Sequence, residues 1–122
     1  MWPMADSVDL ERRIVGAVLA YSKVLEKAGF HPPLAIFTAL LNAQEAILHS
    51  DDLGHDPTPF GRDRMSFAPA VANEFLKDPE SCAQLLRPTF NQIANAGGLD
   101  VSPTFAEGDT WTRTAGWRGI DL

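Results

Sequence analysis

Apolar residues dominate one stretch of the chain, residues 34–50, which reads LAIFTALLNAQEAILHS. Its large apolar residues recur three and four positions apart: Leu34, Phe37, Leu40, Leu41, Ile47 and Leu48, with Ile36 beside them. This spacing is typical of a helix face turned toward a core, and it predicts a central helix. Because polar residues such as Thr38, Asn42 and Glu45 are few, more than one side of this helix is expected to be covered.

A second amphipathic pattern precedes the central helix. Asp6 or Ser7 can accept a hydrogen bond from an N–H of the first turn and so cap a helix start. Gly29 can adopt the left-handed conformation that ends many helices, and Phe30 behind it can fold back on Leu25. The expected buried face holds Leu10, Ile14, Ala17, Val18, Tyr21, Leu25 and Ala28. Two helices joined by a short turn predict an antiparallel helical hairpin.

Further helices are expected after a connection rich in glycine and proline. A third helix is predicted to begin at Ser66 or Ala68. The sequence Asp78-Pro79-Glu80 is a strong start signal for a fourth, because aspartate caps a helix and proline fits its first turn. Pro88 predicts a kink or break within that helix, and Gly97-Gly98 predicts its end.

The pattern changes from Leu99 onward. The alternating residues 110–114 (TWTRT) favour extended structure, and residues 107–109 can turn a small hairpin. The chain is therefore divided into a helical domain, residues 1–98, and a tail, residues 99–122, packed on that domain or on a partner. The expected fold is mainly α: a helical hairpin packed with two or three further helices as a small orthogonal or bundle-like domain, with a short irregular or β-hairpin tail.

Composition narrows the class of protein. With 122 residues, 45% of them apolar and 21% charged, the chain is expected to form one soluble globular domain. Ten basic residues against sixteen acidic ones give a net charge of −6 and no basic stripe, which argues against binding to nucleic acid. A single cysteine excludes an intrachain disulfide, and no apolar run reaches the roughly 20 residues of a membrane span. A cytoplasmic protein without a membrane segment is expected.

The densest cluster of possible metal ligands lies between residues 49 and 56. Imidazole and carboxylate groups are ligands of zinc, manganese and non-haem iron. The spacing matches neither the two-histidine zinc helix motif nor the calcium loop, and an exposed acidic loop gives the same pattern. The candidate ligands of a divalent metal are His49, Asp51, Asp52, His55 and Asp56.

Several polar and aromatic residues are candidates for binding. Tyr21 and Gln44 lie on the two predicted hairpin helices and could line a pocket between them. Asn91 and Asn95 are four residues apart, one above the other on a predicted helix face, where they could bind a partner or stay solvated. Cys82 falls on an apolar stripe and is predicted to be a core residue.

Trp111 and Trp117, with Phe105, are aromatic residues on the predicted extended tail. Such residues either cover the core of their own chain or form the centre of a contact with a partner. The glycines around them favour the second alternative, because a loosely held segment gains order from a partner.

These patterns support three hypotheses for function. The first is a small non-catalytic protein-interaction or regulatory module that binds a protein partner or itself, as a homodimer, through helix faces and the aromatic tail. The second is a small metal-dependent enzyme that uses the Asp/His loop 49–56. The third is a small-molecule sensor with a pocket between helices. The first hypothesis requires no cofactor.

Overall fold

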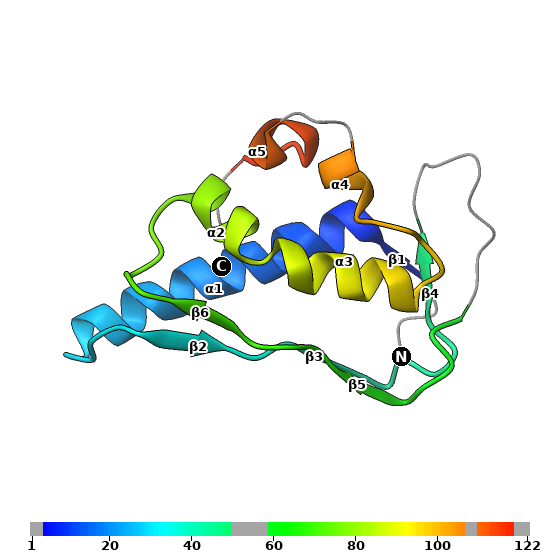
Figure 1. Cartoon of the computed structure of the whole chain (residues 1–122), viewed down its shortest axis with the longest axis horizontal. Helices are drawn as coiled ribbons and strands as arrows, with labels where there is room; N and C mark the ends of the chain where they lie inside the picture. The colour runs from blue at the N-terminus through cyan, green and yellow to red at the C-terminus, as the bar shows by residue number, and fades with distance from the viewer. Residues whose placement is uncertain (1–3, 50–58, 107–109, 119–122) are drawn as a thin grey trace.

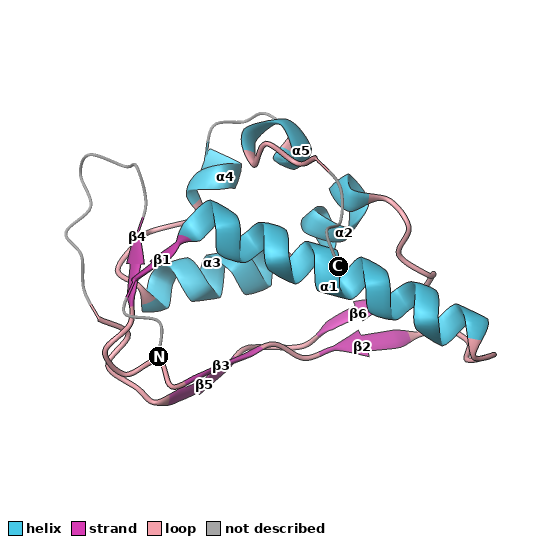
Figure 2. Ribbon diagram, turned by 180° about the vertical axis from the view of Figure 1, so that it is seen from behind, coloured by secondary structure: helices cyan, strands magenta, loops and turns pink. Residues whose placement is uncertain are grey.

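The computed structural model describes most of the chain: residues 4–49, 59–106 and 110–118. These residues form three layers (Figure 1). Helices α1 (Ser7–Lys27) and α3 (Arg87–Ala96) occupy the middle layer. A long β ribbon lies on one side of them, and the short helices α4 (Pro103–Ala106) and α5 (Trp111–Thr114) lie on the other. The view from behind shows the same order of layers (Figure 2).

Helix α1 begins and ends where the sequence predicts. Asp6 is its N-cap residue, and the Asp6 carboxylate accepts hydrogen bonds from two backbone N–H groups of the first turn, at 2.9 and 3.1 Å. At the other end Gly29 has a φ of 89°, and the N–H of Phe30 donates to the carbonyl of Leu25. This bond needs the left-handed residue between helix and turn, a conformation that glycine adopts without a steric penalty.

The buried face of α1 is rotated by about one residue from the predicted one. Its fully buried residues are Ser7, Glu11, Val15, Gly16, Leu19 and Ser22. The predicted positions Leu10, Ile14 and Val18 are only half-buried, and Tyr21 is exposed. Three of the six buried positions are polar, so a count of apolar residues alone placed the face wrongly.

The segment predicted as the central helix is one arm of a β ribbon. Strand β2 (Leu34–Ile36) pairs antiparallel with β6 (Ala70–Ala72), and β3 (Ala39–Leu41) pairs antiparallel with β5 (Arg64–Ser66). The predicted antiparallel helical hairpin is therefore wrong, and so is the third helix expected from Ser66 or Ala68.

The error has a physical cause. Successive side chains of a strand point to opposite faces, so a strand with apolar residues on both faces reads as a continuous apolar run. Such a run also satisfies the three- and four-residue spacing of a helix. The residue before a proline is biased toward extended backbone, and Pro32-Pro33 lies just before β2. The proline pair therefore favours an extended backbone where this segment begins.

A second, smaller strand pair lies at one end of the ribbon. Strand β1 (Met4–Asp6) runs parallel to β4 (Ile47–His49), with Met4 opposite Ile47. Since β1 leads directly into α1, this pair attaches the start of the long helix to the strand that continues from the ribbon (Figure 1).

Three local signals in the second half of the chain are confirmed: a helix start, a break and a helix stop. Asp78 caps α2 (Pro79–Leu85) by accepting hydrogen bonds from the N–H of Ser81 at 2.8 Å and from its hydroxyl at 2.7 Å. A single residue, Leu86, separates the end of α2 from the start of α3 (Arg87–Ala96), so the break predicted around Pro88 is present. Gly98 follows α3 with a φ of 92°, as expected for a helix stop.

The prediction of a mainly α fold is corrected by these findings. The structure is 45% helical and 16% strand, and it has one long helix without a helical hairpin bundle. The tail, predicted as irregular or a β-hairpin, holds the short helices α4 and α5 in its described part. The fold is a long helix and a β ribbon, with shorter helices completing the packing.

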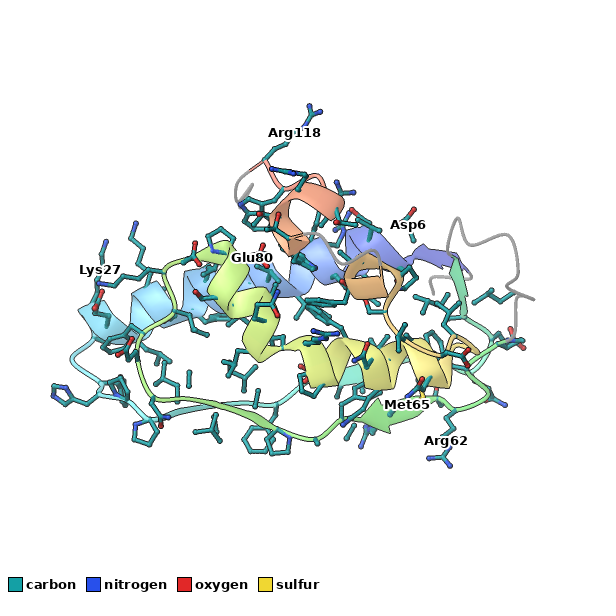
Figure 3. The ribbon with its side chains drawn as sticks, turned by 45° about the horizontal axis from the view of Figure 1, so that its top comes forward. Asp6, Lys27, Arg62, Met65, Glu80 and Arg118 are labelled. Carbon is teal, nitrogen blue, oxygen red and sulfur yellow. The ribbon has the colours of Figure 1, made fainter. Side chains whose placement is uncertain are left out.

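The core lies between the ribbon, the middle helices and the tail. Its largest members come from all of these elements: Val15, Leu19, Leu40, Leu48, Phe60, Met65, Phe67, Leu86, Phe90, Ile93, Leu99, Phe105 and Trp111. Met65 lies on the side of the ribbon that faces α3, whereas Arg62 points away from the molecule (Figure 3). The ribbon therefore has one face in the core and one face in solvent.

Candidate functional site

The solvent-facing side of the first ribbon arm is apolar. Along residues 34–41 the side chains alternate between a more buried and an exposed position, as strand geometry requires. The four exposed positions are Ala35, Phe37, Ala39 and Leu41. Phe37 is 75% exposed and Leu41 is 54% exposed. Both were predicted as core residues, and this prediction is wrong because they lie on the outer side of a strand.

The second arm adds one large apolar residue to the same side. Val71 lies opposite Ala35 in the ribbon and is 53% exposed. The outer stripe is defined here as Ala35, Phe37, Ala39, Leu41 and Val71. Scattered apolar residues on a protein surface are normal, but a contiguous row on one strand face is typical of a binding surface.

A β-bulge sets which residues of the second arm face outward. Ile36 lies opposite Ala70 and Ala39 opposite Ser66, so two residues of the first arm face three of the second. The extra residue shifts the inward and outward alternation of the second arm. The N–H of Ala68 within this bulge donates to the side-chain oxygen of Gln92 on α3, at 3.0 Å. This hydrogen bond attaches the bulge to α3 in the middle layer.

The two ends of the outer stripe differ in charge. Arg62, Asp63 and Arg64 are exposed at the end near Leu41. Asn73 and Glu74 are exposed just beyond Val71, at the other end. The surface therefore has an apolar centre, one end that carries two arginines and an aspartate, and one end that carries a glutamate, the arrangement of a polar rim around an interface core.

One groove borders the stripe. It encloses about 210 Å³ between α1 and β2, and Tyr21 and Phe37 both line it. Tyr21, predicted as a ligand-binding residue, is therefore exposed at this groove. Gln44, its predicted partner in a pocket, is exposed in the turn after β3, where its carbonyl accepts the N–H of Gly61. The structure does not place the two side chains in one pocket.

A larger groove of about 580 Å³ lies between α1 and the segment that leads into α2. Its walls are mainly apolar, with Leu19, Phe75 and Trp117 among them, and a Lys77–Glu26 ion pair of 3.3 Å lies at its margin. No residue predicted to bind a ligand lines this groove, but Trp117, predicted to meet a protein partner, does.

The tail aromatics are packed within the chain. Trp111 is 0% exposed and Phe105 is buried, and Trp117 is half-buried with its ring 5.7 Å from that of Trp111. The ring of Phe105 lies 6.3 Å from that of Phe90 on α3. In this structure these residues cover the core of their own chain, and their contact with a partner stays a prediction.

Trp111 is held by a buried carboxylate that the sequence did not reveal. Glu11 on α1 is buried and accepts hydrogen bonds from the indole N–H of Trp111 at 3.0 Å and from the hydroxyl of Ser102 at 2.5 Å. Burial raises the pKa of the Glu11 carboxyl, and the hydrogen bonds oppose this effect without cancelling it. The group ties the tail to α1 and has no exposed face on which to act.

A second carboxylate holds the same tail helix. Glu80 on α2 accepts hydrogen bonds from the backbone N–H groups of Trp111 at 3.0 Å and Thr112 at 2.8 Å, which are the first N–H groups of α5. Burial raises the pKa of Glu80, but hydrogen bonds from Gln84, Thr112 and Trp111 together lower it below its ordinary value. Glu80 therefore caps α5 from a neighbouring helix.

The two predicted partner-binding asparagines have different positions. Asn91 is half-buried, and its side-chain oxygen accepts the N–H of Ser102 at 2.8 Å, so it anchors the start of the tail. Asn95 is exposed on α3. Cys82 is buried as predicted, and burial together with the Asp78 charge raises the pKa of its thiol to about 12.

The predicted metal cluster falls largely outside the described residues. Only the backbone of His49, in β4, is described, while Asp51, Asp52, His55 and Asp56 are not. In the ranges 4–49, 59–106 and 110–118, no three histidine, cysteine or acidic side chains come together as a metal site requires. The metal hypothesis stays a prediction. Within the same ranges, no helix has the length and apolar content that a membrane crossing requires.

Comparisons of the chain with protein-family models, with curated proteins and with solved structures find no match. The inference of function therefore rests on the geometry of the outer stripe, the grooves and the buried carboxylates.

Proposed function

We propose that this protein is a small non-catalytic interaction module that binds a protein partner through the outer stripe of its β ribbon. The observation that carries the proposal is Phe37, 75% exposed in the middle of a row of apolar residues on one strand. Full burial of a side chain of this size is worth about 1.5–3 kcal/mol. Because Phe37 stays mostly exposed after folding, most of this free energy is available when a partner buries it.

The rigid setting of the stripe supports the same proposal. Leu40 and Met65, the inward neighbours of the stripe, are buried in the core, and Gln92 holds the bulge. A binding surface on an element that is already ordered costs little conformational entropy when the partner arrives. The proposed interaction surface is therefore the ribbon, whereas the sequence alone favours the helix faces and the tail.

The chemistry of the surface favours a protein over other partners. The centre of the stripe is apolar and uncharged, whereas a nucleic-acid surface needs basic residues along the path of the phosphates. The basic residues here are two arginines confined to one end, with the exposed Asp63 between them, in a chain with a net charge of −6. An extended apolar strand face fits the face of another sheet or a helix.

Photo-crosslinking tests the proposal in cells that express the full chain. A benzophenone amino acid in place of Phe37 should form a discrete adduct with a protein upon illumination. The control carries the same group in place of Val101, which is 46% exposed but lies outside the ribbon. Adducts from position 37 that are absent from position 101 support the proposal. Equal adducts, or none from either position, would overturn it.

A further inference from the structure

We propose that the groove between α1 and the segment leading into α2 binds a small amphipathic carboxylate, a free acid with one medium-length apolar chain. This site is separate from the outer stripe and does not depend on the proposed function. The groove encloses about 580 Å³, a volume within the range of about 300–1,000 Å³ that is typical of small-molecule sites.

The walls of the groove determine the body of the ligand. Three segments distant in the sequence form them: α1, residues 75–79, and Trp117 after α5. Leu19 on α1 is buried, while Phe75 and Trp117 are half-buried and leave part of their rings open to the groove. Burial of such apolar surface is worth about 25 cal/mol per Å². An apolar chain is therefore the body that these walls favour.

The two walls are joined to each other without a ligand. The hydroxyl of Ser22, a buried residue of α1, accepts the N–H of Leu76 at 2.8 Å. The ammonium group of Lys77 lies 3.3 Å from the carboxylate of Glu26 on α1. Both contacts hold the segment before α2 beside α1 (Figure 1). The groove is therefore already formed, and a ligand needs to order little of the chain when it binds.

The charged side chains lie at one end of the groove. Along α1 its lining residues change from apolar to charged, in the order Leu19, Ser22, Lys23 and Glu26. Leu19 and Glu26 are seven residues apart, which is about 10 Å along a helix at 1.5 Å per residue. A ligand of this length can place an alkyl chain beside Leu19 and a polar head beside Lys23. The ligand that fits is therefore amphipathic.

The charges at this end favour a negative head. They are two lysines and one glutamate, and Lys77 is already paired with Glu26. Among the residues that the structure describes, none forms an ion pair with the exposed Lys23. An anion can bind Lys23 and leave the existing pair intact, whereas a cation would have to displace Lys77 from Glu26. One lysine suits a singly charged carboxylate, since phosphate groups are usually held by several donors.

Two other grooves lack this combination. A groove of about 560 Å³ between β6 and α2 is lined by the carboxylates of Glu74 and Asp78 against the single cation of Lys77. Its charge therefore disfavours an anion. The groove between α1 and β2 encloses about 210 Å³ and has no charged lining residue. It is smaller than typical small-molecule sites.

Nuclear magnetic resonance of the purified natural chain tests the proposal, with decanoate below its micelle concentration as the probe. Amide signals of Leu19, Lys23 and Phe75 should shift and saturate at one ligand per chain. Decanol, which is uncharged, and decyltrimethylammonium, which is positive, should bind several-fold more weakly. No shifts, shifts centred on Phe37 of the outer stripe, or tighter binding of the cation would each overturn the proposal.

Variants of the charged end test the head-group contact. Lys23→Gln should weaken decanoate binding about two- to fivefold, the size expected of an exposed ion pair, and Lys23→Arg should restore it. The matched control is Lys27→Gln, exposed on the same helix but outside the groove, which should leave the Kd unchanged. Equal losses from Lys23→Gln and Lys27→Gln would contradict a specific contact with Lys23.

A variant of the wall tests the contact with the alkyl chain. Phe75→Ala should weaken decanoate binding about tenfold, while Phe37→Ala, on the outer stripe, should have no effect. The reverse order would place the ligand on the ribbon and overturn the proposal. Sedimentation of the chain with phosphatidylglycerol vesicles, without any response to decanoate, would identify a membrane surface as the source of the alkyl chain and overturn the proposal of a free acid.

Discussion

The tail helices and the β ribbon treat their large apolar side chains in opposite ways. Trp111 in α5 is completely buried, its indole N–H is bound by Glu11, and its backbone N–H is bound by Glu80. Phe37 in the ribbon is three-quarters exposed in a row of apolar neighbours. The tail therefore uses its aromatic residues to stabilise the fold, while the ribbon leaves one apolar face exposed.

The difference shows that the role of a large apolar side chain has to be judged both from its burial and from the hydrogen bonds that its polar atoms make. A tryptophan that contributes to folding has both its apolar surface and its polar atoms accommodated inside the chain. A surface reserved for binding is apolar, ordered from behind, and polar only at its ends. By this criterion we propose the outer stripe, and not the tail, as the surface for a partner.

The largest expected effect is that of Trp111→Ala. Removing a fully buried tryptophan should lower the free energy of unfolding by about 3–5 kcal/mol, through lost burial and the cavity left behind. Trp111→Phe should lower the free energy of unfolding by less, because an aromatic ring is retained, although the hydrogen bond to Glu11 is lost. Denaturant unfolding measures both. A loss below about 1 kcal/mol for Trp111→Ala would show that the tail is not part of the stable core.

Glu11→Ala should have the next largest effect. It leaves the indole N–H of Trp111 and the hydroxyl of Ser102 without their acceptor, at about 1–3 kcal/mol for a buried unsatisfied group.

Glu11→Gln should change the dependence of stability on pH. The pKa of the folded-state Glu11 carboxyl is raised above its ordinary 4.5, so its contribution to stability is fully present below pH 4.5 and is lost as pH rises through the folded pKa. The lowered pKa values of Asp78 and Glu80 act in the opposite direction and at lower pH. Urea unfolding between pH 4.5 and 7 should show a falling contribution in the natural chain that Glu11→Gln lacks. Identical slopes would contradict this assignment.

Gln92→Ala should have a moderate effect, about 0.5–1.5 kcal/mol, because the N–H of Ala68 in the bulge loses its acceptor. Hydrogen exchange at Ala68 should accelerate in the same variant. The matched control is Asn95→Ala, on the same helix but exposed, which should stay within about 0.5 kcal/mol. Equal losses from the two variants would mean that Gln92 does not hold the ribbon.

The smallest effect on stability is expected from the outer stripe itself. Leu41→Ala should change the free energy of unfolding of the purified chain by about 0.5 kcal/mol or less. Its neighbour Leu40 is buried on the opposite face, and Leu40→Ala should cost about 2–5 kcal/mol. A large loss from Leu41→Ala would indicate that the stripe belongs to the core and not to an interface.

The sequence predicts the parts of this fold that depend on local signals. Asp6 and Gly29 mark the bounds of α1, Asp78 marks the start of α2, and Pro88 marks the break before α3. Each of these residues acts on the backbone within one or two turns, so its effect does not depend on the rest of the fold. The same signals do not predict which elements each helix packs against.

The ribbon and the buried carboxylate could not be predicted in this way. Ribbon pairing joins residues such as Ala35 and Val71, whose separation carries no local signal. A lone charge is costly to bury, and the acceptor role that makes burial of Glu11 favourable depends on Ser102 and Trp111, about a hundred residues away. The strand alternation of residues 34–41 was the available signal, but the apolar outer side concealed it.

The bulge of the ribbon also limits how the chain can aggregate. A two-stranded ribbon has open edges whose backbone groups invite further strands, and an apolar strand sequence makes such growth into fibrils more favourable. Pro69 has no N–H to offer an added strand, and the N–H of Ala68 is already bound by Gln92. These residues interrupt one edge at the level of the apolar centre. The ribbon can thus have an exposed apolar face while one of its edges remains unsuited to the addition of further strands.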